Sequence, residues 1–265
     1  MLIICPRAAR TATNPLLTMN WTSFIKALTN RSSIATHKEI QQIREYLLSY
    51  GVGETKGGLC RVASSSAVNG GKGVYLQRDV KKGELLTLYG GIQFPQPPLG
   101  VATNDMGDQE KAITPIVDCS DYILNLGGLG KGYLDGFGSE IQNRKCGQII
   151  NHPPGGIRPN VDAIEFMWTS IWADASSDED KDLLQKVAHG INTIYQGPWY
   201  HDGDIVHTPA PGDSDYNLYY AGIAMVAKQD LKAHSELFLD YELNERLLDS
   251  HTREWYTPVP FRLNE

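Results

Sequence analysis

The sequence predicts a mainly β protein with some α-helix. Short runs of β-branched, aromatic and aliphatic residues, separated by Gly and Asp, follow one another from Leu59 onward. The clearest expected strands are 74–76, 85–89, 164–172, 219–227 and 237–241. Many short strands with little helix between them favour a compact β domain over a doubly wound parallel sheet. We find no internal repeat in the sequence.

A helix is expected before this β region, within an N-terminal segment that spans 36–58. Thr36 and Glu39 stand at the spacing of a capping box, in which two side chains satisfy backbone N–H groups at a helix N-terminus. The residues that follow on one helical face are apolar or aromatic: Ile40, Ile43, Leu47 and Tyr50. Gly51 is placed to end the helix, and the glycine-rich stretch Gly51–Gly58 is expected to be a linker.

Residues 1–35 are expected to form a basic, disordered leader. The stretch 1–38 contains five basic residues and no acidic one, and the leader is rich in Thr, Asn and Ser. This composition is typical of a mitochondrial or plastid transit peptide, and the alternative is a leader before a second start at Met19. We expect an intracellular protein of the nucleus or cytoplasm. Because of this composition, a mitochondrion or plastid is the alternative location.

Composition and charge exclude several classes of protein. A chain of 265 residues with 41% hydrophobic content can bury a full core, and its longest apolar runs are shorter than the roughly 18 residues of a membrane span. A net charge of -7 disfavours non-specific binding to nucleic acid and suits a basic polypeptide partner. No C-x-x-C pair occurs, so that neither a zinc site nor a disulfide framework is indicated, and isolated reduced thiols are expected at Cys5, Cys60, Cys119 and Cys146.

Two further clusters have an ordinary interpretation. His201, Asp202, Asp204 and His207 match no standard metal-ligand spacing, and they are expected to lie in a solvated loop. The glycine-rich run Gly127–Gly132 resembles a phosphate-binding loop but lacks the Gly-Lys-Ser/Thr ending and a following helix, so that a flexible loop is expected.

Residues 173–218 are expected to be an insertion between two strands. The region 161–222 contains eleven acidic residues and two lysines, an excess of nine negative charges. The polar run Ser176–Asp180 is expected to cap a helix whose apolar side carries Leu183, Leu184, Val187, Ile191 and Ile194. This charge suggests an appendage that binds a substrate or partner, and the alternative is a lineage-specific decoration.

Four short motifs stand in a fixed order along the chain. Glycines in the first motif allow positive φ angles and a close approach of the backbone to a ligand. The polar pair in the third motif follows the apolar Ile149-Ile150, and burying both side chains without hydrogen-bond partners would cost a few kcal/mol. The motifs are Gly71-Lys72-Gly73, then Tyr89-Gly90-Gly91, then Asn151-His152 with Pro159-Asn160, then Glu236-Leu237-Phe238-Leu239-Asp240-Tyr241.

In this order, the motifs resemble those of the SET domain, the fold of most protein-lysine methyltransferases. The resemblance covers about residues 61–241, which gives a SET domain at 59–241 and a C-terminal tail at 242–265. It implies a β-clip fold of short strands, in which the Asn-His segment passes under the C-terminal strand to form a pseudoknot. It also implies S-adenosyl-L-methionine (AdoMet) as the cofactor.

The resemblance implies a role for each matched residue. The cofactor-binding residues are expected to be Gly71, Lys72, Gly73, Asn151 and His152. Tyr241 aligns with the catalytic tyrosine of the family, and Tyr89 would form the lysine channel with it. The implied reaction is methyl transfer to a lysine of a basic protein or peptide, such as a histone tail. The free lysine pKa is about 10.4, and a narrow desolvating channel lowers it so that the neutral amine can attack. No metal is required.

The chain departs from the family pattern at three places. Pro153-Pro154 replaces Ser-Cys after the histidine, Gln148 replaces an arginine, and His234-Ser235 replaces Gly-Glu. Gln148 and His234-Ser235 favour an alternative, a SET-fold module that binds a peptide or protein with little or no turnover. A structural scaffold that uses the acidic insertion is a second alternative. Since the cysteine-rich flanking segments of many histone methyltransferases are absent, aromatic packing around Trp255-Tyr256 would have to close the channel.

Overall fold

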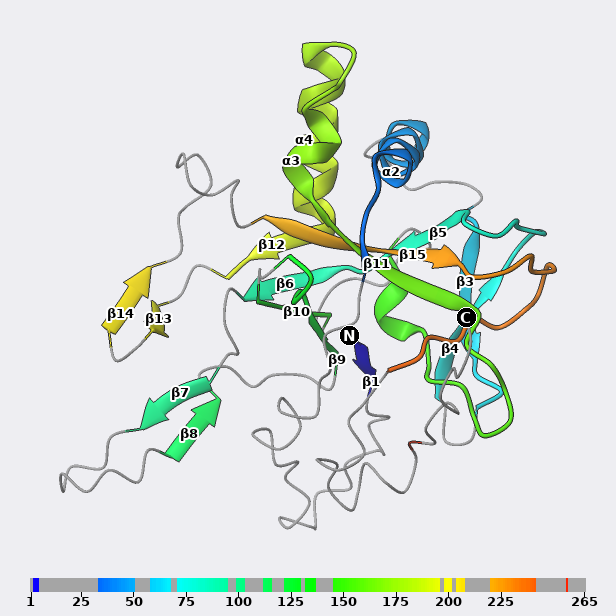
Figure 1. The fold of residues 1–265 in the computed structure, drawn as a ribbon, viewed down its shortest axis with the longest axis horizontal. Coiled ribbons are helices and arrows are strands. Elements are labelled where there is room, and N and C mark those ends of the chain that lie inside the picture. The colour runs from blue at the N-terminus through cyan, green and yellow to red at the C-terminus, as the bar shows by residue number, and fades with distance from the viewer. Residues whose placement is uncertain are drawn as a thin grey trace.

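The structure is a computed structural model, and it describes residues 2–4, 33–50, 58–67, 71–94, 99–102, 112–115, 122–129, 132–136, 145–195, 198–201, 204–207, 220–241 and 256. The described chain is mixed α/β, with most of its regular structure in strands that form small sheets and with few helices (Figure 1). The prediction of a mainly β protein with some helix is therefore confirmed at this level.

A four-stranded sheet in the order β2-β11-β15-β5 forms the centre of the molecule. β11 (Val161–Met167) and β15 (Ala221–Ala227) pair antiparallel along their full length. β5 (Leu85–Leu88) flanks β15 antiparallel, and β2 (Ser33–Ile34) flanks β11 in parallel. Every residue of β15 is buried, as expected for an apolar strand that is covered on both faces.

Three helices lie together on one side of this sheet (Figure 1). They are α2 (His37–Tyr50), α3 (Trp168–Trp172) and α4 (Asp178–Ile191). Arg44 of α2 ties the layer together, because its guanidinium donates to the carbonyl oxygens of Ile171 at 2.6 Å and Ser170 at 3.1 Å. These contacts fix the C-terminal end of α3 against the middle of α2.

Alternation along β11 divides the core into two clusters. Ile164 and Phe166 belong to the cluster under the helices. Their neighbours Ala163 and Met167 pack against the second cluster, on the opposite face. The second cluster contains Tyr89, Tyr241 and Tyr256 of the candidate site described below.

Among the described residues, the remaining strands form one larger sheet and three two-stranded sheets. The five-stranded sheet has the order β1-β9-β10-β6-β12, with strands Leu2–Ile4, Tyr122–Asn125, Tyr133–Asp135, Gly91–Phe94 and Asn192–Ile194. The two-stranded sheets are β3-β4, β7-β8 and β13-β14, with strands Cys60–Ser64, Lys72–Leu76, Leu99–Ala102, Ala112–Pro115, Pro198–His201 and Asp204–His207. A short 3₁₀ helix, η1 (Gly147–Ile149), precedes the Asn-His pair.

Both predicted helices are confirmed. At the start of α2, Thr36 N donates to Glu39 Oε2 at 2.7 Å and Glu39 N donates to Thr36 Oγ1 at 3.4 Å, which is a capping box. At the start of α4, Ser177 Oγ accepts from Asp180 N at 3.1 Å. The predicted apolar positions Leu184, Val187 and Ile191 are buried in α4, and Ile40, Ile43 and Leu47 are buried in α2.

Three element predictions were wrong in detail. The expected strand 164–172 ends at Met167, and Trp168–Trp172 is helical. The strand preference of Trp168 is overridden by packing, because its ring lies 4.9 Å from that of Phe166 and 5.7 Å from that of Tyr220. Its backbone N–H still donates to Tyr220 O at 3.0 Å, which extends the β11-β15 pairing by one residue. Ile194 lies beyond α4 in β12, and 237–241 forms isolated bridges in place of a regular strand.

Two loop predictions also need correction. His201 and Asp204 pair across the β13-β14 hairpin, so this region is a hairpin and not a loop. The backbone N–H groups of Gly128 and Leu129 donate to the buried Glu165 carboxylate at 3.1 and 2.8 Å. The glycine-rich run therefore contains an ordered turn that binds a carboxylate of the protein itself.

Cys60 and Cys146 are free, buried thiols, as predicted. Cys60 Sγ donates to Leu86 O at 3.5 Å, and the neighbouring Cys146 together with burial raises the pKa of Cys60. Asp202, most of the predicted leader and the linker, and the tail apart from Tyr256 lie outside the described residues, as do Cys5 and Cys119. No helix in the described part of the chain has the length and hydropathy of a membrane span. The described residues also contain no group of three or more His, Cys, Asp or Glu side chains that could hold a metal ion.

Candidate functional site

The segment 236–241 is held between two parts of the chain. On one side, Leu239 N donates to Asn151 O at 3.0 Å, and a parallel bridge joins Asn151 to Phe238. On the other side, Asn160 N donates to Phe238 O at 2.9 Å. The third and fourth motifs of the sequence are therefore interleaved in space.

The Asn160 side chain strengthens the second of these contacts. Its Nδ2 donates to Glu236 O at 2.9 Å, and its Oδ1 accepts from Phe238 N at 2.8 Å. Asn160 is buried, and its amide makes the backbone hydrogen bonds that a neighbouring strand would otherwise make with the segment. The Pro-Asn part of the motif thus has a structural reason for an asparagine.

The Asn151 side chain joins the third motif to the first. Its Nδ2 donates to Lys72 O at 2.9 Å and to Ser65 Oγ at 3.0 Å. The sequence argument that this buried polar side chain must be satisfied is correct. Both N–H groups of the amide are directed at protein acceptors.

The glycines of the first motif have different roles. Gly71 has φ +52° and is exposed, and a Cβ added there would meet no described atom within 4 Å. Gly73 is buried, and an added Cβ would lie 2.2 Å from Glu236 Oε1. Gly73 therefore makes room for a carboxylate, whereas the space beside Gly71 is open although its carbonyl accepts from Ser65 N at 3.0 Å. The Lys72 side chain is exposed.

Glu236 is a buried carboxylate that accepts four hydrogen bonds. Ser65 Oγ and Ser66 Oγ donate to it in short contacts, Ser66 N donates at 2.8 Å, and Tyr75 Oη donates at 2.9 Å. Burial opposes ionisation of Glu236, but the hydrogen bonds from Ser65 and Ser66 outweigh it and hold the pKa below its usual value. The group is therefore an anion at neutral pH.

His152 and Tyr241 are neighbours in the structure. The backbone N–H of Tyr241 donates to His152 Nδ1 at 3.2 Å, and the ring centroids lie 5.1 Å apart. The hydroxyl of Tyr241 donates to Ile150 O at 3.0 Å. Tyr256 of the tail also contacts His152, with the two rings tilted and their centroids 4.5 Å apart. Three aromatic rings thus meet at the end of the 236–241 segment.

Tyr89 is fully buried and belongs to the same hydrophobic cluster as Tyr241. Its backbone N–H donates to Ile223 O at 2.9 Å, and its carbonyl accepts from Asn192 Nδ2 at 3.0 Å. A Cβ added at Gly136 would lie 3.0 Å from the Tyr89 hydroxyl oxygen. The hydroxyl therefore lies against the backbone at Gly136.

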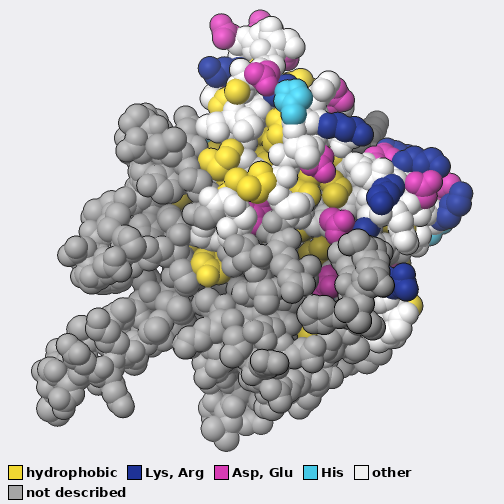
Figure 2. All heavy atoms as spheres, viewed as in Figure 1, with side chains coloured by type: hydrophobic (Ala, Val, Ile, Leu, Met, Phe, Trp, Pro, Cys, Tyr) yellow, Lys and Arg dark blue, Asp and Glu magenta, His cyan; other side chains and the backbone are white. Residues whose placement is uncertain are grey.

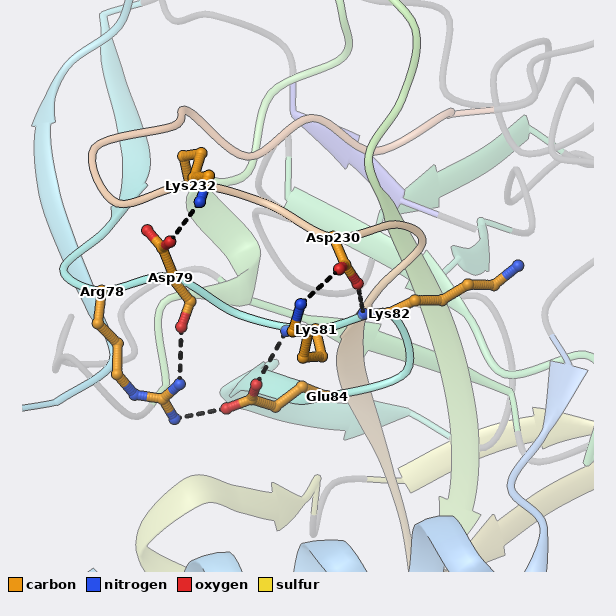
Figure 3. A network of polar contacts seen from close by, with 7 residues as sticks. All are labelled: Arg78, Asp79, Lys81, Lys82, Glu84, Asp230 and Lys232. Carbon is orange, nitrogen blue, oxygen red and sulfur yellow. Dashed lines mark hydrogen bonds and ion pairs between the residues drawn. The ribbon is translucent and has the colours of Figure 1, made fainter.

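Two turns hold each other through matching contacts, and the second turn leads into segment 236–241 (Figure 3). The first turn is 78–84 and the second is 229–235, and Val80 and Leu231 form an antiparallel bridge between them. Lys232 Nζ and Ala233 N donate to Asp79, and Lys81 Nζ and Lys82 N donate to Asp230. The hydrogen bond from Lys232 lowers the pKa of Asp79, and the hydrogen bond from Lys81 lowers the pKa of Asp230.

This reciprocity is a short internal repeat that the sequence reading missed. Each turn contains Asp, then Val or Leu, then Lys, and each has a residue with positive φ at the same place. In the first turn this residue is Gly83 with φ +79°, and in the second it is His234 with φ +68°. His234 is thus a non-glycine residue at a position that favours glycine.

Several residues at the site were not predicted to belong to it. Ser65, Ser66 and Tyr75 surround Glu236, but in the sequence they are only a polar run after one strand and an aromatic residue within another. Glu236 itself was matched to the family without a role. Gln148 is buried, so the departure from arginine places a neutral side chain in the interior. Hydrogen bonds between residues 161 to 171 positions apart leave no local pattern in a sequence.

Comparison with protein-family models gives no match, and a search of curated proteins finds no relative of this chain. The function is therefore argued from the motifs and the site geometry.

Proposed function

We propose that the chain is a SET-type, AdoMet-dependent protein-lysine N-methyltransferase. The observation that carries the proposal is the interleaving of segment 236–241 between Asn151 and Asn160. This arrangement supports the pseudoknot that the resemblance implies. It also brings the Gly-Lys-Gly loop, the Asn-His pair and Tyr241 to one region, although these motifs lie far apart in sequence.

The chemistry of these residues fits an AdoMet site. Gly71 and Lys72 are exposed beside the Asn-His pair, and the aromatic rings at His152 are of the kind on which an adenine stacks once they are uncovered. The anionic Glu236 is linked to the Asn151 side chain through the Ser65 hydroxyl, and its negative charge favours a cationic ligand. When bound, AdoMet supplies the methyl group on a sulfonium. The protein must hold the acceptor amine neutral and in line with it.

Tyr241 is the residue proposed to orient the lysine amine. Its hydroxyl proton is directed at Ile150 O. A phenol that donates its proton can still accept a hydrogen bond through its oxygen, so it can bind an amine N–H. Tyr241 and Tyr89 are buried in one cluster, which supports a desolvated aromatic channel that lowers the lysine pKa. Tyr256 would help to close this channel in place of a zinc-bound tail.

A basic protein or peptide, such as a histone tail, is the proposed substrate. Asp178, Glu179 and Asp182 are exposed on α4. Acidic side chains are prominent on the helices at the top of Figure 2, where basic ones lie among them. Not all of the acidic excess is available, because Glu165 is buried and Asp162 pairs with Lys228 at 3.0 Å.

The proposal is tested by methyl transfer from radiolabelled AdoMet to proteins of an extract, with Tyr241→Phe as the test variant. The variant keeps the ring and removes one hydroxyl, so we expect the rate to fall at least about tenfold with little change in AdoMet affinity. Tyr220→Phe is the matched control, since Tyr220 is also fully buried and donates to a carbonyl, that of Asn192, but belongs to the hydrophobic cluster under the helices and not to that of Tyr241. Equal rates for wild type and Tyr241→Phe would show that Tyr241 only packs.

A binding module without turnover is the second candidate. It is favoured by the Asn151 amide, whose two N–H groups both donate to protein acceptors and would have to exchange partners to contact a ligand. Saturable AdoMet or peptide binding without methyl transfer would support this candidate over the enzyme.

A further inference from the structure

Glu236 is connected to Asn151 through one serine hydroxyl. A serine hydroxyl has one proton to donate and an oxygen that can accept. Ser65 directs its proton to Glu236 Oε1, and its oxygen accepts from Asn151 Nδ2 at 3.0 Å and from Ala67 N at 3.0 Å. The orientation of the hydroxyl therefore depends on a negative acceptor at Glu236.

The same carboxylate is fitted to its surroundings on the other side. Its second oxygen accepts from Ser66 N and Tyr75 Oη, so that the serine pair is fixed against β4. The glycine at position 73 is required because any Cβ there would overlap the carboxylate. These contacts determine where the Ser65 hydroxyl lies, and Asn151 in turn donates to Lys72 O within the Gly-Lys-Gly motif.

We infer that ionised Glu236 is a positioning residue, which fixes the side-chain amide of Asn151 against the Lys72 backbone through the Ser65 hydroxyl. The inference rests on the proposed function only for its consequence, which is that removal of the charge weakens AdoMet binding. The arrangement of the three side chains can be tested without any ligand.

The charged and titratable groups around Glu236 restrict the pH range of the effect. Burial first, and then the hydrogen bond to Glu236, raises the pKa of Tyr75, so this phenol stays neutral where the carboxylate titrates. The Arg61 guanidinium lies over the Tyr75 ring, 5.1 Å from its centroid. Because the pKa of Glu236 is lowered by folding, its stabilising contribution is present above the unfolded value of about 4.3 and is lost as pH falls through the folded pKa.

The test uses the full chain and NMR of the Asn151 side-chain NH₂ group. In the wild type we expect these signals to shift with pH as Glu236 is protonated. In Glu236→Gln they should lie near the low-pH position and show no such titration, and Ser65→Ala should abolish the dependence as well. Glu165→Gln is the matched control, because it changes another buried carboxylate, which accepts from Gly128 N and Leu129 N outside the site.

AdoMet affinity is the second readout. Loss of the fixed Asn151 amide should weaken binding by about three- to tenfold in Glu236→Gln, which corresponds to one hydrogen bond, and Glu236→Asp should recover part of it. If the Asn151 signals of folded Glu236→Gln match the wild type at every pH, the inference is wrong. If those signals follow Glu236 but wild type has no AdoMet affinity, the positioning stands and the proposed function fails.

Discussion

In the layer of α2, α3 and α4, apolar side chains such as Leu47, Ile171 and Leu184 are buried against one another and against the sheet. In the region around segment 236–241, buried polar side chains lie among the apolar ones: Asn151, Asn160 and Glu236 all donate to or accept from a neighbouring part of the chain. Apolar packing tolerates substitutions of similar volume, whereas a buried polar contact needs its particular partner. The second region is therefore the one whose residue types are tied to geometry and to chemistry.

The largest expected effects contrast these two regions directly. Leu184→Ala removes a fully buried side chain from the helical layer and should lower the free energy of unfolding by about 2–5 kcal/mol, with AdoMet affinity unchanged. Asn160→Ala leaves Glu236 O and Phe238 N without their side-chain partner and should cost about 2–4 kcal/mol. Denaturant unfolding and calorimetry on the same samples measure both quantities. The contrast disappears if Asn160→Ala is as stable as wild type.

The two reciprocal turns allow a smaller test of local strain. Gly83→Ala should destabilise the protein by about 1 kcal/mol, since the φ of Gly83 is positive. The added Cβ meets no described atom within 4 Å, so no steric clash adds to this cost. His234→Gly should be neutral or stabilising by up to about 1 kcal/mol, because relief of strain exceeds the added entropy of the unfolded chain. Thermal unfolding of the two variants should therefore move in opposite directions. A loss of stability in His234→Gly would mean that the histidine side chain makes a stabilising contact.

The smallest expected effect is at the acidic start of α4, and it concerns substrate affinity. Neutralising Asp178, Glu179, Asp180 and Asp182 with Asn or Gln should raise the Michaelis constant for a basic protein substrate by a few-fold, most clearly at low salt, because exposed charges act mainly on encounter. The maximal rate and AdoMet affinity should stay nearly constant. An unchanged Michaelis constant at every salt concentration would limit these acids to capping the helix.

The two regions also differ in how far the sequence predicts them. The capping box at Thr36 and the apolar spacing in α4 are local patterns, and both helices follow them. Trp168 was assigned to a strand from the local pattern alone. Its ring packing with Phe166 and Tyr220 depends on the tertiary structure and leaves no signal in that pattern. At the site, the motifs identified Asn151, His152 and Tyr241, whereas the serines that bind Glu236 carry no signal of their own. Contacts made across distant segments are specified by the fold as a whole, and no periodicity records them.

The measurement that tests the central claim most directly is AdoMet binding by isothermal titration calorimetry, with wild type, Asn151→Ala and Gln93→Ala compared. Gln93 is the matched control, since it is also buried and accepts a hydrogen bond from Ala221 N at 3.0 Å outside the site. The account predicts saturable binding to wild type and Gln93→Ala, and binding weaker by on the order of 1–3 kcal/mol in folded Asn151→Ala. No AdoMet binding to the wild type, or equal affinity in Asn151→Ala, would contradict it.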